Sequence, residues 1–340
     1  MLIDMIEPYA FFPVCSYPLF ESLLRKRNDI SDLGYLYLGN TFEYSRAEEI
    51  KVINGELNIS FGIKKYIHEE TYDITNSKVN GYLAKKLNDI YGVTIYYKSF
   101  KNYNTYKEYI RKQLAVGEPI VCQYNLMFTP TKVQYKKRDG VHTIMILGER
   151  LENYTYDCME EGVNPYFELK EEDLKKCFDY NVSVYGDNKV YIIKKEVEKI
   201  IDEHQLFCKF TDKIYNEEIE QLEILGKFVY DMNLYLKNKT DKKKFTIPNL
   251  WTISLEKKTT VRWIEKYMKN RNDIDELDKL GMLKNGIQET ADIWVNIVFF
   301  LERNMYLKEW KNSDKLIDKL YEVQEKEIMN YTLWKMLKEK

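Results

Sequence analysis

The distribution of strand and helix patterns along the chain constrains its fold more than any other feature. Short apolar or alternating segments typical of strands recur up to about residue 195, with amphipathic helical patterns between them. Beyond residue 196 strand patterns nearly vanish, and long helical patterns cover 217–236, 259–269, 275–307 (with an expected break near Gly281 to Gly286) and 311–338. We therefore predict an α+β domain over residues 1–195, followed by an α-helical domain over residues 196–340.

The composition excludes several classes of protein. Apolar residues make up 44% and charged residues 31% of the 340 residues, which is typical of a globular chain. The 52 basic and 54 acidic residues leave a net charge of only −2, which attracts neither nucleic acid nor an anionic membrane. No apolar run reaches the ~20 residues of a membrane span, and the first residues lack a signal-peptide pattern. We expect a cytoplasmic protein that binds neither nucleic acid nor membrane.

The cysteines first direct attention to a candidate nucleophile. They lie at positions 15, 122, 158, 177 and 208, without a CxxC pair or zinc-binding spacing, so we expect reduced thiols and no metal site. Pro18 fits only the first turn of a helix, so a helix begins near Cys15 or Ser16. Backbone amides at a helix N-terminus stabilise a thiolate and can donate to an oxyanion. Cys15 is thus a candidate nucleophile, with a buried structural cysteine as the alternative.

The scarcity of histidine narrows the search for a base. Only three are present, at positions 68, 142 and 204. His142 opens an apolar strand pattern, whereas His68 and His204 have charged or polar neighbours typical of solvated surface. His142 is therefore the candidate base for a cysteine nucleophile.

A hairpin could supply the group that orients this imidazole. A second strand pattern follows His142's strand after a short turn and contains Asp157. If the turn is centred between Glu149 and Arg150, His142 lies directly opposite Asp157 on one face of the sheet. A slip of one residue in register would separate the two side chains. We predict a triad of Cys15 as nucleophile, His142 as base and Asp157 as orienting acid.

The order of helix cysteine, strand histidine and strand aspartate is that of papain-like folds. Residues 10–160 also resemble the papain-fold acyltransferases typified by the butirosin biosynthesis protein H. The matching features are the early cysteine, Ile30–Asp32, Leu38–Phe42, the strand Gly117–Val121, and a histidine strand ending in Gly148 before a hairpin to an aspartate. The fold expectation is therefore a papain-like catalytic domain with an appended helical domain.

The resemblance implies an enzyme that moves an acyl group from a carrier-protein thioester to a small amine and so forms an amide. It implies Cys15, His142 and Asp157 in the roles given above, and no cofactor beyond the phosphopantetheine arm of an acyl or peptidyl carrier protein. A thiotemplated antibiotic pathway, such as that of closthioamide in clostridia, is the implied setting. Two positions depart from the pattern: Asn125 replaces a usual aspartate, and Tyr9 replaces the oxyanion-hole glutamine of peptidase relatives.

Further residues are predicted to surround the nucleophile and to meet the partner. The oxyanion hole and an apolar substrate pocket that excludes water are assigned to Tyr9, Tyr17, Asn40, Phe42 and Asn125, with core packing as the alternative for the aromatic residues. A contact with an acidic carrier protein is assigned to the loop cations Lys132, Lys136, Lys137 and Arg138, with a solvated loop as the alternative. The helical domain is expected to form a wall of the cleft or a homodimer surface.

Two other functions fit the same residues. A cysteine peptidase or amidase would use the same triad with water in place of the amine. A non-catalytic binding or assembly protein would need Cys15 only for packing.

Overall fold

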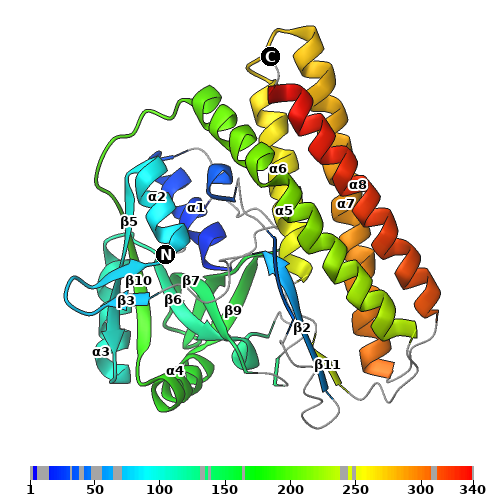
Figure 1. The fold of residues 1–340 in the computed structure, drawn as a ribbon. Coiled ribbons are helices and arrows are strands. Elements are labelled where there is room, and N and C mark those ends of the chain that lie inside the picture. The colour runs from blue at the N-terminus through cyan, green and yellow to red at the C-terminus, as the bar shows by residue number, and fades with distance from the viewer. Residues whose placement is uncertain are drawn as a thin grey trace. The chain divides into compact units, whose positions relative to one another are not determined.

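The computed structural model divides the chain into two compact units (Figure 1). It describes residues 3–5, 15–30, 33–37, 42–46, 56–63, 71–130, 135–136, 139–162, 165–237, 244–246, 250–307 and 312–338. One unit comprises Met1–Leu36 and His68–Ile200, and the other Tyr37–Ile67 and Ile201–Lys340. The fold is mixed α+β, as predicted. Unlike the predicted division at residue 195, Tyr37–Ile67 belongs with the helices.

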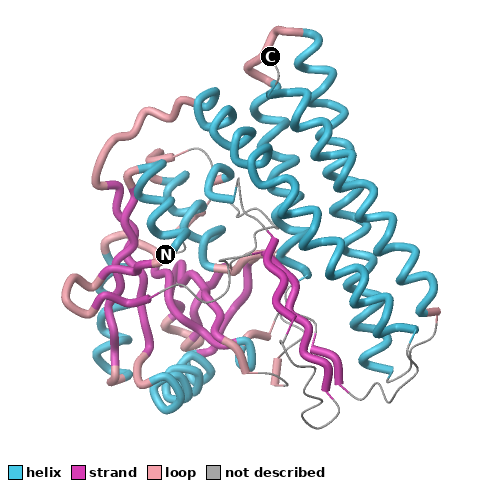
Figure 2. The backbone as a smooth tube through the Cα atoms, in the orientation of Figure 1, coloured by secondary structure: helices cyan, strands magenta, loops and turns pink. Residues whose placement is uncertain are grey.

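The first unit is built on an eight-stranded antiparallel sheet in the order β3-β4-β5-β10-β6-β7-β8-β9 (Figure 2). Its strands are β3 (Thr71–Asp73), β4 (Lys78–Asn80), β5 (Val93–Phe100), β6 (Ile120–Asn125), β7 (Val141–Arg150), β8 (Thr155–Met159), β9 (Tyr166–Lys170) and β10 (Asn188–Lys195). The apolar runs at 93–97, 119–125, 141–148 and 189–194, whose pattern is typical of strands, largely coincide with β5, β6, β7 and β10. They were recognisable because central strands, covered on both faces, carry nearly continuous apolar runs.

Four helices cover this sheet: α1 (Ser16–Lys26), α2 (Tyr82–Tyr91), α3 (Tyr103–Ala115) and α4 (Glu171–Tyr185). Helices α3 and α4 pack on one face, whereas α1 packs against β7 and α2 against β5 on the other (Figure 1). Helix α2 ends at Gly92, whose φ of +68° lies in the left-handed region that glycine adopts readily. A Cβ there would lie 2.0 Å from the Val197 carbonyl oxygen, so glycine is required.

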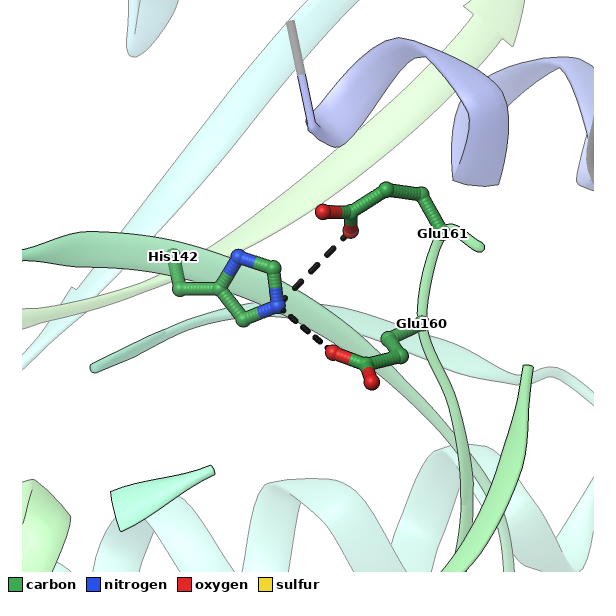
Figure 3. A group of neighbouring side chains, drawn as sticks. All are labelled: His142, Glu160 and Glu161. Carbon is green, nitrogen blue, oxygen red and sulfur yellow. Dashed lines mark hydrogen bonds and ion pairs between the residues drawn. The ribbon is translucent and has the colours of Figure 1, made fainter. Parts of the chain in front are cut away.

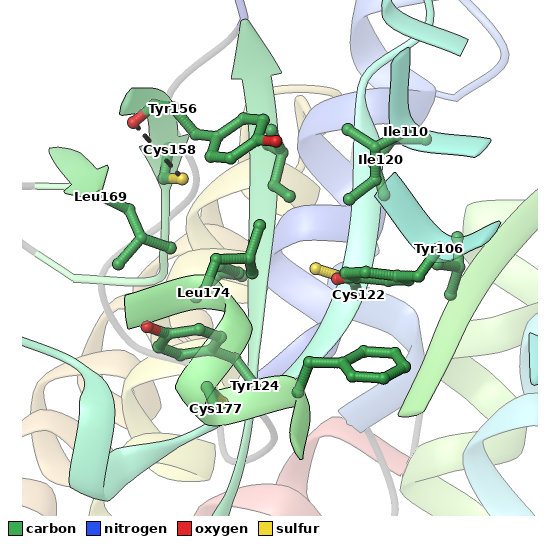
Figure 4. Close-up of a cluster of buried hydrophobic side chains, with 14 of the residues drawn as sticks. Tyr106, Ile110, Ile120, Cys122, Tyr124, Tyr156, Cys158, Leu169, Leu174 and Cys177 are labelled. Carbon is green, nitrogen blue, oxygen red and sulfur yellow. Dashed lines mark hydrogen bonds between the residues drawn. The ribbon is translucent and has the colours of Figure 1, made fainter. Parts of the chain in front are cut away.

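A core of aromatic and thiol side chains fills the space between the sheet and helices α3 and α4 (Figure 4). Tyr106 and Tyr124 are fully buried in it, together with Cys122, Cys158 and Cys177. Burial raises the pKa of the Cys122 thiol to about 12 and raises those of Cys158 and Cys177 strongly. These three thiols are therefore inert packing groups at neutral pH.

The second unit contains long helices and a small sheet. The helices are α5 (Glu203–Lys237), α6 (Leu250–Met268), α7 (Ile274–Leu307) and α8 (Ser313–Lys338), and the strands β1 (Phe42–Arg46), β2 (Glu56–Ile63) and β11 (Lys244–Thr246). Strand β2 pairs with β11 in parallel, and β1 and β2 contact α5 and α6, which explains why this early segment belongs with the helices. No helix in the described part of the chain is long and apolar enough to cross a bilayer.

The predicted break in the third long helix is wrong, because α7 runs unbroken through Gly281 and Gly286. Gly286 instead allows α8 to approach. A Cβ at Gly286 would lie 2.2 Å from Asn330 Oδ1, and the buried Asn330 is held by donating to Thr290 Oγ1 at 2.9 Å. A Cβ at Gly281 would meet nothing within 4 Å.

These two glycines give a matched pair for a stability measurement. We expect Gly286→Ala to lower the free energy of unfolding by about 1–3 kcal/mol, because the added methyl group displaces a buried, hydrogen-bonded amide. Gly281→Ala should raise the free energy by up to about 1 kcal/mol, since alanine restricts the unfolded chain and fills no occupied space. Urea unfolding followed by circular dichroism measures both. Equal effects of the two substitutions would contradict the packing described.

Candidate active site

Cys15 lies immediately before α1, as predicted, and is half-buried. The helix begins at Ser16, and Pro18 occupies its first turn, where the missing N–H costs nothing. Because α1 packs against β7, the Cys15 thiol comes within 4.0 Å of Thr143 Oγ1 on that strand. The thiol is thus brought next to the strand that carries His142.

His142 is the second residue of β7 and is only 2% exposed. It pairs with Tyr124 of β6, which fixes its backbone inside the sheet. Its Nε2 lies 2.9 Å from Glu160 Oε2 and 3.7 Å from Glu161 Oε2 (Figure 3). The Cys15 side chain is close enough to the ring to raise its pKa. Because Nε2 is engaged by Glu160, Nδ1 is the nitrogen left for the thiol.

The surroundings of His142 favour its protonated form. Burial alone lowers the pKa of the imidazole, but the hydrogen bonds with Cys15 and Glu160 and the charge of Glu161 outweigh burial and raise the pKa to about 10. The ring is therefore an imidazolium at neutral pH. An imidazolium in contact with a thiol stabilises the thiolate, which is the reactive form of cysteine.

The predicted contact between His142 and Asp157 is wrong. In the hairpin Gly148 lies opposite Asp157, and Ile146 lies opposite Cys158 across a bulge. The turn spans residues 151–154, later than expected, because the strands pair as far as Arg150 and Thr155. Asp157 instead binds Arg150 through both carboxylate oxygens, at 2.7 and 3.0 Å.

The shift in register brings Glu160 to the imidazole in place of Asp157. Glu160 directly follows β8 and is 3% exposed. Its backbone N–H donates to the Pro165 carbonyl oxygen at 2.8 Å, which holds the chain in a turn as it leaves the strand. The sequence signal for this carboxylate is the pair of adjacent acids at 160 and 161 directly after a buried strand.

Among the residues predicted for the substrate pocket, the structure describes the side chains of Tyr17 and Asn125, and both make contacts other than the predicted ones. Tyr17 is fully buried within α1 and packs edge-on against Phe20. Tyr9 and Asn40 lie outside the described residues. Phe42 begins β1 in the other unit, and its side chain also lies outside the described part.

Asn125 holds the loop that follows β6. Its Nδ2 donates to Asp139 Oδ1 at 2.6 Å, and its Oδ1 accepts from the Met127 backbone N–H at 3.0 Å. The side chain is completely buried. An aspartate at this position would face the Asp139 carboxylate at hydrogen-bonding distance, so an amide fits here where a carboxylate would be repelled.

Of the loop cations predicted to contact a carrier protein, only Lys136 is described. Its ammonium lies over the ring of Tyr135, 4.9 Å from the centroid, and its backbone N–H donates to the Met127 carbonyl oxygen. Lys132, Lys137 and Arg138 lie outside the described residues.

No protein-family model matches this chain, and no curated protein matches it. The likeness to papain-fold acyltransferases therefore stays a hypothesis. The functional assignment depends on the arrangement of Cys15, His142 and Glu160.

Proposed function

We propose that this protein is a papain-like cysteine acyltransferase that forms an amide bond. The observation that supports the proposal is the convergence of three groups within one unit: a half-exposed thiol before a helix, a buried imidazolium, and a buried carboxylate on its Nε2. Nucleophilic cysteine catalysis needs this set, because the imidazole moves the proton and the carboxylate holds the ring in one tautomer.

In the first half-reaction the Cys15 thiolate attacks the carbonyl carbon of a carrier-bound thioester. The new carbon–sulfur bond forms as the phosphopantetheine thiolate leaves, and the His142 imidazolium supplies the proton that this leaving group takes up. The exchange replaces one thioester by another, so its reaction free energy is close to zero. An acyl group on Cys15 and a neutral His142 remain.

In the second half-reaction an amine attacks the acyl-enzyme. Neutral His142 accepts a proton from the attacking nitrogen, and the Cys15 thiolate departs to leave an amide. The charge of Glu160 on Nε2 stabilises the imidazolium that forms again. The enzyme thus returns to its starting ion pair without an outside acid or base.

A direct test loads a carrier protein with a panel of aliphatic and aromatic acyl thioesters and follows the products by mass spectrometry. We expect an acyl adduct on Cys15 without amine, and its conversion to amide when primary amines are added. A Cys208→Ala variant is the control and should behave like the wild type, because that exposed thiol lies in the other unit.

The other outcomes separate the competing functions. Release of free acid with every amine would assign hydrolysis, and with it a peptidase or amidase. The absence of any adduct on Cys15 across the panel would contradict covalent catalysis and favour a binding protein.

A further inference from the structure

Two carboxylates approach one nitrogen of His142, although a catalytic triad needs only one. Glu160 Oε2 lies 2.9 Å and Glu161 Oε2 3.7 Å from the same Nε2 (Figure 3). A single N–H can donate a good hydrogen bond to one of these oxygens only, so the shorter contact with Glu160 takes it. Glu161 then adds a second, largely buried negative charge beside the first.

The three side chains meet the distance requirements of a metal site. One ligand atom from each of His142, Glu160 and Glu161 lies within 4.8 Å of the other two. Ligand atoms about 2.1 Å from a tetrahedral zinc ion are roughly 3.4 Å apart. The separations of 2.9 and 3.7 Å from Nε2 lie on either side of that value.

We propose that His142, Glu160 and Glu161 bind a zinc ion, which reversibly inhibits the cysteine site. One imidazole nitrogen and two carboxylates match zinc better than magnesium, which prefers oxygen ligands and retains several waters. The fourth position would be left for water or a small anion. This set has none of the paired cysteines by which zinc sites are usually recognised in a sequence; its ligands are a strand histidine and the two acids after the next strand.

Inhibition follows from the position of the proton, and this part of the inference rests on the proposed function. Zinc requires the lone pair of Nε2, so the Nε2 proton is released to solvent when the metal binds. The neutral ring then keeps its one remaining proton on Nδ1. This neutral ring is a much weaker acid than the imidazolium, so His142 no longer supplies the proton that the leaving thiolate takes up, and Glu160 is withdrawn to the metal.

A second histidine–thiol contact must be removed before zinc binding is measured. Cys208 Sγ lies 3.7 Å from His204 Nε2 in the first turns of α5, and this thiol is exposed. Such a pair could also hold zinc. A Cys208→Ser background eliminates it without touching the candidate active site, which lies in the other unit.

Isothermal titration with ZnCl₂ in the Cys208→Ser background, with excess MgCl₂ present, tests the site. We expect one zinc ion per chain, and about 100-fold weaker binding when Glu161→Gln is added. Glu168→Gln is the matched control, because Glu168 is an exposed acid on the neighbouring β9 that pairs with Arg150, and it should leave the affinity unchanged. Thermal unfolding without metal checks that all variants fold.

Zinc K-edge absorption identifies the ligands independently of activity, and nitrogen and oxygen scatterers without sulfur are expected. Equal affinity of the Glu161→Gln and parent proteins, or a zinc–sulfur contribution, would overturn the proposal. Failure of zinc binding with normal acylation of Cys15 would leave the proposed function intact. Zinc binding without any acylation would retain the metal site and reject the enzyme.

Discussion

Replacing Cys15 with alanine should lower kcat/KM for the proposed amide formation by at least about 10³-fold, because the proposed covalent intermediate can no longer form. The fold should be retained, since the side chain is only half-buried and the helix it precedes begins at Ser16. Circular dichroism and product analysis by mass spectrometry measure the two effects on the same sample. A variant that still makes the amide at a comparable rate would reject the covalent mechanism.

The same cysteine should be the first to react with iodoacetamide at pH 6. The pKa of His142 is raised to about 10, so the ring beside Cys15 stays positively charged at pH 6. Cys122, Cys158 and Cys177 are buried, with their pKa values raised by burial, and should not react in the folded protein. Peptide mapping after short exposure gives the order of labelling.

Cys208 is the internal reference for that measurement, because it is the other cysteine that solvent reaches. Its contact with His204 lies at 3.7 Å, and Arg271 places a guanidinium nitrogen 3.1 Å from the same imidazole. Cys208 lies inside α5 and not at the free backbone amides of a helix start, so we expect a slower thiol than Cys15. Labelling of Cys208 before Cys15 would contradict the assignment of the nucleophile.

Glu160→Gln should lower kcat by between about 10² and 10⁴-fold, whereas Asp157→Asn should leave it within about twofold of wild type. Glutamine has nearly the shape of glutamate but carries no charge, and its amide can favour the wrong imidazole tautomer. Asp157 binds Arg150 on the surface side of the hairpin and does not meet His142. Steady-state kinetics of both variants, with unfolding curves, makes the comparison.

This pair of variants distinguishes the hairpin register that the sequence suggested from the one observed. A large loss in Asp157→Asn together with a mild effect in Glu160→Gln would restore the original triad. Comparable losses in both variants, without loss of stability, would mean that neither carboxylate is specific to the imidazole. The large effect in Glu160→Gln alone supports the arrangement described.

Local patterns were sufficient where short-range interactions decide the structure. The start of α1 depends on Pro18 and the apolar spacing after it, and the end of α2 depends on Gly92. The strand of His142 could be recognised from its continuous apolar run, because a strand covered on both faces needs one. By contrast β9, whose residues alternate between buried and exposed positions at the edge of the sheet, was missed.

Helix interruptions were misjudged where glycine serves packing between helices. Gly281 and Gly286 suggest a helix break, yet α7 is continuous because it packs against α6 and α8. Gly286 leaves space for Asn330. Intrinsic propensity is a weak preference that burial of a helix face overrides. The sequence of α7 alone does not indicate that a side chain on α8 requires glycine at position 286.

The amino-acid sequence by itself determined which thiol and which imidazole were candidates, because residues close together in the sequence specify a helix start and a buried strand. It did not determine which carboxylate completes the set. That depended on the register of β7 and β8, which the length of the turn and one bulge decide. A shift of a few residues replaced Asp157 by Glu160 and added Glu161 at the same nitrogen. Only the tertiary structure could bring these acids to His142, since their contact spans two strands and a turn.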